Sequence, residues 1–174
     1  EQQRGARRGM ARMQESLQQM QQALRQNQQR EVVNAMRRAF QDLVELSRRQ
    51  EALKEATAGL DPGSRGFREN AQEQMSVLRD LGTVTESLSR LSQKTFGVSP
   101  EMGKALGDAM RQMSQAMESL EGRNGAAGAQ QQAGAMASLN SAASLVQGAM
   151  QAMMQGSGQG MGMAGFMQRL GQLS

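Results

Sequence analysis

Methionines at three-residue spacing are the side chains of this sequence that come closest to a chemical site. Met110 and Met113, like Met150 and Met153, place two thioether sulfurs on one face of a helix. Thioethers bind Cu(I), so a copper site is one interpretation. However, the chain has no His and no Cys to complete such a site, and methionines on an apolar stripe usually belong to a core. We therefore expect no metal and no cofactor, and assign these methionines to helix packing.

The carboxylates of residues 101–121 likewise form no catalytic pattern. A di-metal site in a helical bundle uses Glu-x-x-His spacing, and this chain has no His. The segment 156–162 is rich in glycine but lacks the Lys-Ser/Thr that ends a phosphate-binding loop. Without imidazole or thiol groups, the chain lacks the usual general bases and nucleophiles that act near neutral pH. The sequence predicts no enzymatic activity.

The methionines belong to apolar stripes whose members are three or four residues apart. One stripe runs from Met10 to Leu24, and similar ones lie within residues 106–120 and 136–153. Such a stripe occupies one face of a helix and is buried against another helix. The residues that we expect to make these helix-packing contacts are Leu17, Met20, Leu24, Met110, Met113, Met117, Met150 and Met153.

Glycine and proline divide the chain into helical segments. Residues 1–58 are expected to form one long, basic helix rich in Gln and Arg. The apolar stripe of this helix changes register across Gln26–Arg30. In the next helix the predicted stripe passes through Phe67, Ala71 and Met75. Ser99 and Pro100 mark a further helix start. The predicted parts after the first helix are a turn at 59–66, a three-helix antiparallel region at 67–155, a Gly-rich linker at 156–162 and the start of an amphipathic helix at 163–174.

These segments predict an all-α fold, with long helices in an antiparallel coiled-coil-like bundle or hairpin stack. The first helix is expected to run beside the others and to project beyond them. Both ends of the sequence lie in segments that are typical of helices, so we interpret the chain as part of a longer protein.

Charge and composition bear on the class of partner. The net charge is +4, and the arginines concentrate in the first helix. Nucleic-acid modules usually add stacking aromatics, and this region has only Phe40, so nucleic acid is not the expected partner. Binding of the first helix to an anionic membrane surface is a further interpretation. Residues 124–168 carry no charge, but they contain too many Ser, Asn and Gln for a membrane span.

One segment resembles a known family. Leu91 to Gly107 reads LSQKTFGVSPEMGKALG, and the stretches 120–124 and 135–140 reinforce the likeness. They resemble the Gln/Met-rich helical region of large uncharacterised bacterial envelope proteins with N-terminal transmembrane helices. The resemblance covers most of residues 30–174. It implies a bacterial envelope location on an unknown side of the membrane, and attachment through parts of the parent chain outside this segment. It supplies no activity and no functional residues.

The hypothesis that follows is a structural or scaffolding module that packs on partner helices, either of a second copy, as a homo-oligomer, or of another protein. The alternative is a Met-rich groove that binds hydrophobic peptides or partner helices, because methionine side chains are flexible and polarizable.

Overall fold

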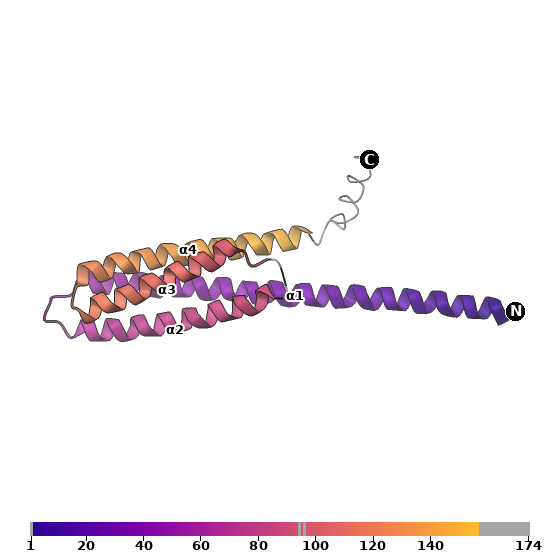
Figure 1. The fold of residues 1–174 in the computed structure, drawn as a ribbon, viewed down its shortest axis with the longest axis horizontal. Helices are drawn as coiled ribbons and strands as arrows, with labels where there is room; N and C mark the ends of the chain where they lie inside the picture. Colours follow the sequence, from indigo (N-terminus) through magenta and orange to yellow (C-terminus); the bar gives the residue numbers. More distant parts are fainter. Residues whose placement is uncertain (1, 94, 96, 157–174) are drawn as a thin grey trace, which may run out of the picture.

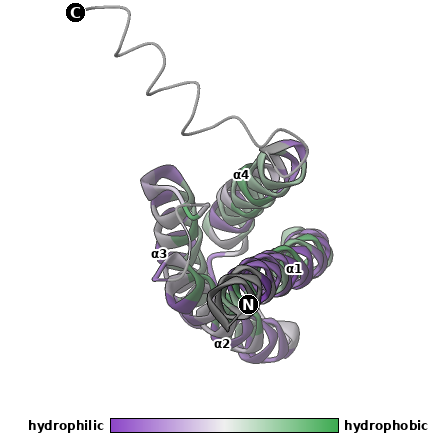
Figure 2. Cartoon of the chain, turned by 90° about the vertical axis from the view of Figure 1, so that its right-hand side faces the viewer, coloured by the Kyte–Doolittle hydropathy of each residue, from purple (hydrophilic) through white to green (hydrophobic). Residues whose placement is uncertain are grey.

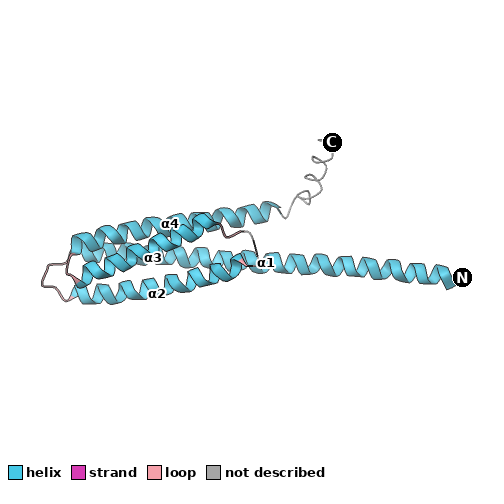
Figure 3. Cartoon of the chain, viewed as in Figure 1, coloured by secondary structure: helices cyan, strands magenta, loops and turns pink. Residues whose placement is uncertain are grey.

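Four helices pack against each other in chain order in the computed structural model, which describes residues 2–93, 95 and 97–156. They are α1 (Gln2–Ala58), α2 (Gly66–Ser92), α3 (Pro100–Glu121) and α4 (Gly125–Gly156). Within these residues there is no strand (Figure 3). The predicted all-α class is therefore confirmed. The predicted helix start at 163–174 and almost all of the predicted linker lie outside the described residues.

Each helix packs on its two neighbours in a ring, α1 on α2 and α4, and α3 on α2 and α4. Figure 2, which looks along the bundle, shows the four helices around a common centre. The short connections make consecutive helices antiparallel (Figure 1). The second half of α1 is thus one of the four bundle helices, beside the three that the sequence predicted for residues 67–155.

Capping side chains explain where α3 and α4 begin. The Ser99 hydroxyl accepts a hydrogen bond from the Met102 amide at 3.3 Å, and Pro100 follows at the first helical position. Hydrogen bonds from its own backbone amide and then from the Ser99 hydroxyl lower the pKa of the Glu101 carboxyl below its ordinary value. The Asn124 side chain accepts from the Ala127 amide at 3.1 Å, so α4 begins at Gly125.

The turn between α3 and α4 is closed by a residue with left-handed backbone. Arg123 has φ of 58°, a region that glycine usually occupies after a helix. The Asn124 amide donates to the Ser119 carbonyl at 2.8 Å, which satisfies one of the last carbonyls of α3. The Arg123 guanidinium also donates to the Pro62 carbonyl at 2.9 Å. This bond ties the α3–α4 turn to the α1–α2 turn at the same end of the bundle.

The core combines large side chains with many alanines. Met36, Leu43, Leu81, Met113 and Leu139 are fully buried. Many of the buried side chains of α3 and α4 are small, and the buried alanines of these two helices are Ala105, Ala109, Ala116, Ala135, Ala142 and Ala143. Alanine at inner positions lets a helix pack closely on its neighbours.

The predicted stripe of α2 was wrong at Met75. This side chain is 46% exposed, whereas the neighbouring Gln74 is fully buried. The inner positions of α2 follow Phe67, Gln74, Val77 and Leu81, and Gln74 is held there by hydrogen bonds. A buried amide with satisfied hydrogen-bonding groups is tolerated in a core, and it shifts the buried face by one position from the one that apolar residues alone indicate.

That amide belongs to a layer of three buried glutamines. Gln50 and Gln74 exchange two hydrogen bonds of 2.9 and 3.0 Å between α1 and α2. The Gln132 amide of α4 donates to the Gln74 carbonyl oxygen at 3.1 Å. All three side chains have no exposed surface, and the Gln132 Oε1 atom has no hydrogen-bond partner within the described part of the chain. Because amide pairs fit only in matching positions, we expect this layer to set the relative register of the three helices.

Arg49 adds a polar contact at the edge of the α1–α2 interface. Its guanidinium lies 2.7 Å from the Glu73 carboxylate and 2.6 Å from the Asp80 carboxylate. The hydrogen bond to Asp80 raises the pKa of Arg49 most, and the hydrogen bond to Glu73 raises it further. All three side chains are partly exposed, so these ion pairs stabilise the fold only modestly. Their main effect is to orient α1 and α2 relative to each other.

Candidate interaction surface

The first half of α1 extends away from the bundle (Figure 1). We call residues 2–31 the arm, because Met10 and every described side chain from residue 12 to 31 are exposed. At 1.5 Å per residue the arm is about 45 Å long. Its sequence favours helix, being rich in Gln, Arg, Met, Leu and Ala.

The stripe of the arm is exposed along its whole length. The exposed fractions are 62% for Met10, 66% for Met13, 51% for Leu17, 56% for Met20 and 61% for Leu24. These are large apolar side chains on one face, and no helix of the described chain covers them. A row of apolar side chains of this kind marks an interaction surface more often than a solvated face. We call these five residues the arm stripe.

Of the eight predicted packing residues, five lie on the bundle helices α3 and α4 and three lie on the arm. Met113 is fully buried and Met150 is 9% exposed, both within the bundle core. Met110, Met117 and Met153 are half-buried. They flank the core because the inner positions of α3 and α4 carry mainly alanines and leucines. The remaining three, Leu17, Met20 and Leu24, lie on the arm stripe without a packing partner among the described residues.

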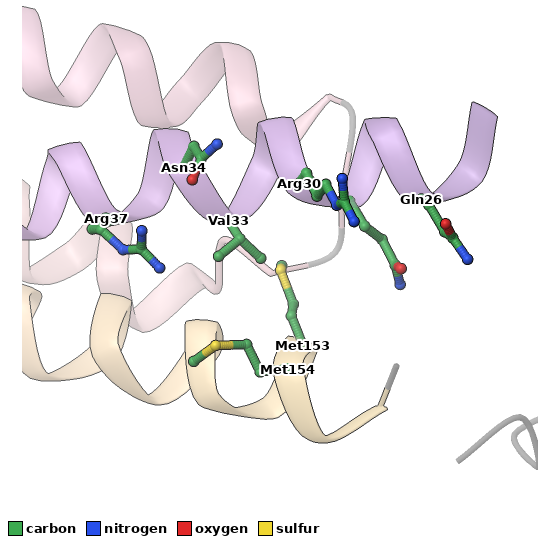
Figure 4. A pocket seen from close by; sticks show the side chains of 8 residues that line it. Gln26, Arg30, Val33, Asn34, Arg37, Met153 and Met154 are labelled. Atoms are coloured by element: carbon green, nitrogen blue, oxygen red, sulfur yellow. The ribbon is translucent and has the colours of Figure 1, made fainter. Parts of the chain in front are cut away.

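A shallow hollow lies where the arm leaves the bundle. It has a volume of about 460 Å³ and is lined by Met153 and Met154 of α4 and by Gln26, Gln29, Arg30, Val33, Asn34 and Arg37 of α1. Figure 4 shows Met153 reaching from α4 towards Val33. Five of the eight lining residues are polar or charged α1 side chains, more polar than the usual pocket for an apolar ligand. The hollow is therefore not the predominantly apolar site that a hydrophobic peptide would need.

Other kinds of site receive no support from the described residues. Among them no three His, Cys, Asp or Glu side chains are grouped so as to hold a metal ion. Nor is any described helix both long and apolar enough to cross a membrane. The chain matches no protein family model, no curated protein and no solved structure.

Sequence reasoning found the arm stripe but missed the glutamine layer. The stripe is visible because its spacing is regular and its residues are apolar. The glutamines are separated by 24 and 58 positions along the chain, and their type suggests exposure. A weak signal for Gln74 exists in its spacing, because it lies seven residues after Phe67 and seven before Leu81.

Proposed function

We propose that this chain is a structural interaction module of a larger bacterial envelope protein. In this proposal the bundle serves as a rigid base, and the arm presents its stripe to another helix in a coiled-coil-like pair. The observation that carries the proposal is the exposed arm stripe. The envelope location depends on the resemblance of residues 91–107 and is proposed with it.

The energetics of the arm favour a partner. A helix that lacks tertiary contacts gains stability only from local propensity, and most helices in proteins depend on a packed apolar face. The arm has such a face, and the fold leaves it uncovered within the described chain. A partner helix on the stripe would supply the missing packing, since each large apolar side chain contributes about 1.5–3 kcal/mol on full burial.

The arrangement favours helix packing over capture of hydrophobic peptides by a methionine groove. Met113 and Met150 are buried in the core, so a peptide could not contact them without opening the bundle. The arm stripe is a convex helix face rather than a groove. Such a face suits a second helix, which meets it by interdigitation of side chains.

Site-specific photo-crosslinking tests the proposal. A photoreactive residue placed at Met20, on the arm stripe, is expected to crosslink the full chain to a helical segment in the cells that produce it. The matched control carries the same residue at Gln22, an exposed arm position off the stripe. We expect strong crosslinking at Met20 and at least about tenfold less at Gln22. Equal or absent crosslinking at the two positions would refute the assignment of the stripe as a contact surface.

A further inference from the structure

The face that carries the arm stripe continues along the outside of the bundle. Following the heptad spacing onward from Leu24 leads to Asn27, Glu31, Asn34 and Arg38, all of which are exposed. The buried positions of α1 at this level, such as Met36 and Ala39, lie on a different face. The stripe therefore points away from the core side of α1. A helix of another molecule can lie on the five residues of the arm stripe without displacing a core residue.

The residues that flank the arm stripe carry no charge. In a coiled coil these flanking positions set partner choice through charge pairs, and here they are Gln14, Ser16, Gln21 and Ala23. The charged residues Arg12, Glu15 and Arg25 occupy outer heptad positions and are exposed. Within residues 10–24, no charged residue at a flanking position selects an acidic or a basic partner helix. An apolar stripe with neutral flanks is complementary to itself.

We propose that the arm stripe binds the arm stripe of a second copy of this chain in an antiparallel pair. This inference rests on the proposed function and names its partner. The pair has two-fold symmetry, so the same surface serves on both molecules. In the register that we propose, Met10 lies opposite the partner's Met20, and Leu17 lies opposite the partner's Met13.

Charge decides the orientation. In a parallel pair the same face would continue beyond the stripe, so that Glu31 would meet the second copy's Glu31 and Arg38 its Arg38. Like charges in direct opposition are unfavourable. In the antiparallel pair each arm ends where the other molecule's bundle begins, and the two bundles lie at opposite ends. In this register Met10, Met13, Leu17 and Met20 of the two arms form the paired surface, and Leu24 lies beyond it.

The length of the stripe sets the strength of the pair. It covers about two heptads, whereas coiled coils are usually recognised over three or four. We therefore expect a reversible dimer whose dissociation constant is about 1–100 μM rather than nanomolar.

Sedimentation velocity across this concentration range tests the pair. The wild-type chain is expected to shift from monomer to dimer, and the Met13→Asp/Leu17→Asp double variant to weaken the dimer at least about tenfold. The control Gln18→Asp/Gln22→Asp makes the same charge change at the same spacing on exposed positions off the stripe, and it is expected to dimerise like the wild type. Circular dichroism shows whether each variant retains the folded bundle. A wild-type chain that stays monomeric, or an undiminished dimer of the stripe variant, would overturn the proposal.

Disulfide trapping tests the orientation, because the chain has no cysteine of its own. A mixture of the Met10→Cys and Met20→Cys variants is expected to form a disulfide-linked dimer on oxidation. Either variant alone is expected to form little, because its thiol lies about 15 Å along the helix from its counterpart. Efficient self-linking by Met10→Cys alone would instead show a parallel pair.

The photo-crosslinking result separates the two proposals. A crosslinked product of twice the mass of the chain supports both. A product that contains a different protein, with a monomeric wild-type chain in sedimentation, refutes the second copy while the arm remains a contact surface. The absence of any product at Met20 refutes both.

Discussion

Replacing Met113 with Asp is expected to unfold the bundle. Met113 is fully buried in α3, so the substitution places a carboxylate in an apolar core without a cationic partner. Burying an unpaired charge costs several kcal/mol, and we expect a loss of about 4 kcal/mol or more in the free energy of unfolding. That loss is a large fraction of the roughly 5–15 kcal/mol that stabilises a typical domain. Circular dichroism should show loss of helix at room temperature or a much lower Tm.

The matched control for Met113→Asp is Met75→Asp. Met75 lies on α2 of the same bundle, but it is 46% exposed, so its carboxylate would remain solvated. We expect this variant to lose less than about 1 kcal/mol and to keep its helical content. Similar melting curves for the two variants would show that Met113 does not occupy the centre of the core.

Replacing Gln74 with Ala is expected to have the second largest effect. Gln74 accepts from both Gln50 and Gln132 and also donates to Gln50. Its truncation leaves two buried amides without their partner and opens a cavity. Each unsatisfied buried group costs about 1–3 kcal/mol, so we expect a total loss of about 2–4 kcal/mol. The urea midpoint of unfolding measures this loss.

The triple variant Gln50→Leu/Gln74→Leu/Gln132→Leu distinguishes the cost of unpaired amides from the contribution of the layer itself. Replacing all partners with apolar groups of similar size removes the unsatisfied atoms, including Gln132 Oε1, and is expected to leave stability unchanged or higher. If the triple variant were less stable than Gln74→Ala, the layer would stabilise the bundle directly rather than mainly specify its register.

Much of the fold could be predicted from residue types and spacing. The Gly- and Pro-bearing breaks separate the helices, Ser99 and Pro100 mark the start of α3, and the change of register after Leu24 marks the division of α1 into arm and bundle helix. These signals are local, because each depends on the backbone preference or the periodicity of a short stretch.

The inner layer could not be predicted in the same way. Gln74 is buried and Met75 is exposed because of hydrogen bonds to residues on other helices. A polar residue becomes acceptable in a core only when a partner is in place, and a single sequence does not show which distant residues meet. The stripe of the arm was predicted, whereas its lack of a partner among the described helices required the structure.

Amide hydrogen exchange of the segment 10–24, followed as the protein concentration is raised, tests the arm as an assembly surface most directly. An uncovered helical arm opens readily, so its amides exchange quickly in the monomer, while those of the buried half of α1 are protected. We predict that protection of residues 10–24 rises with concentration in the wild type and not in the Met13→Asp/Leu17→Asp variant. Fast exchange of this segment at all concentrations, in a sample that sedimentation shows to be dimeric, would contradict assembly through the arm stripe.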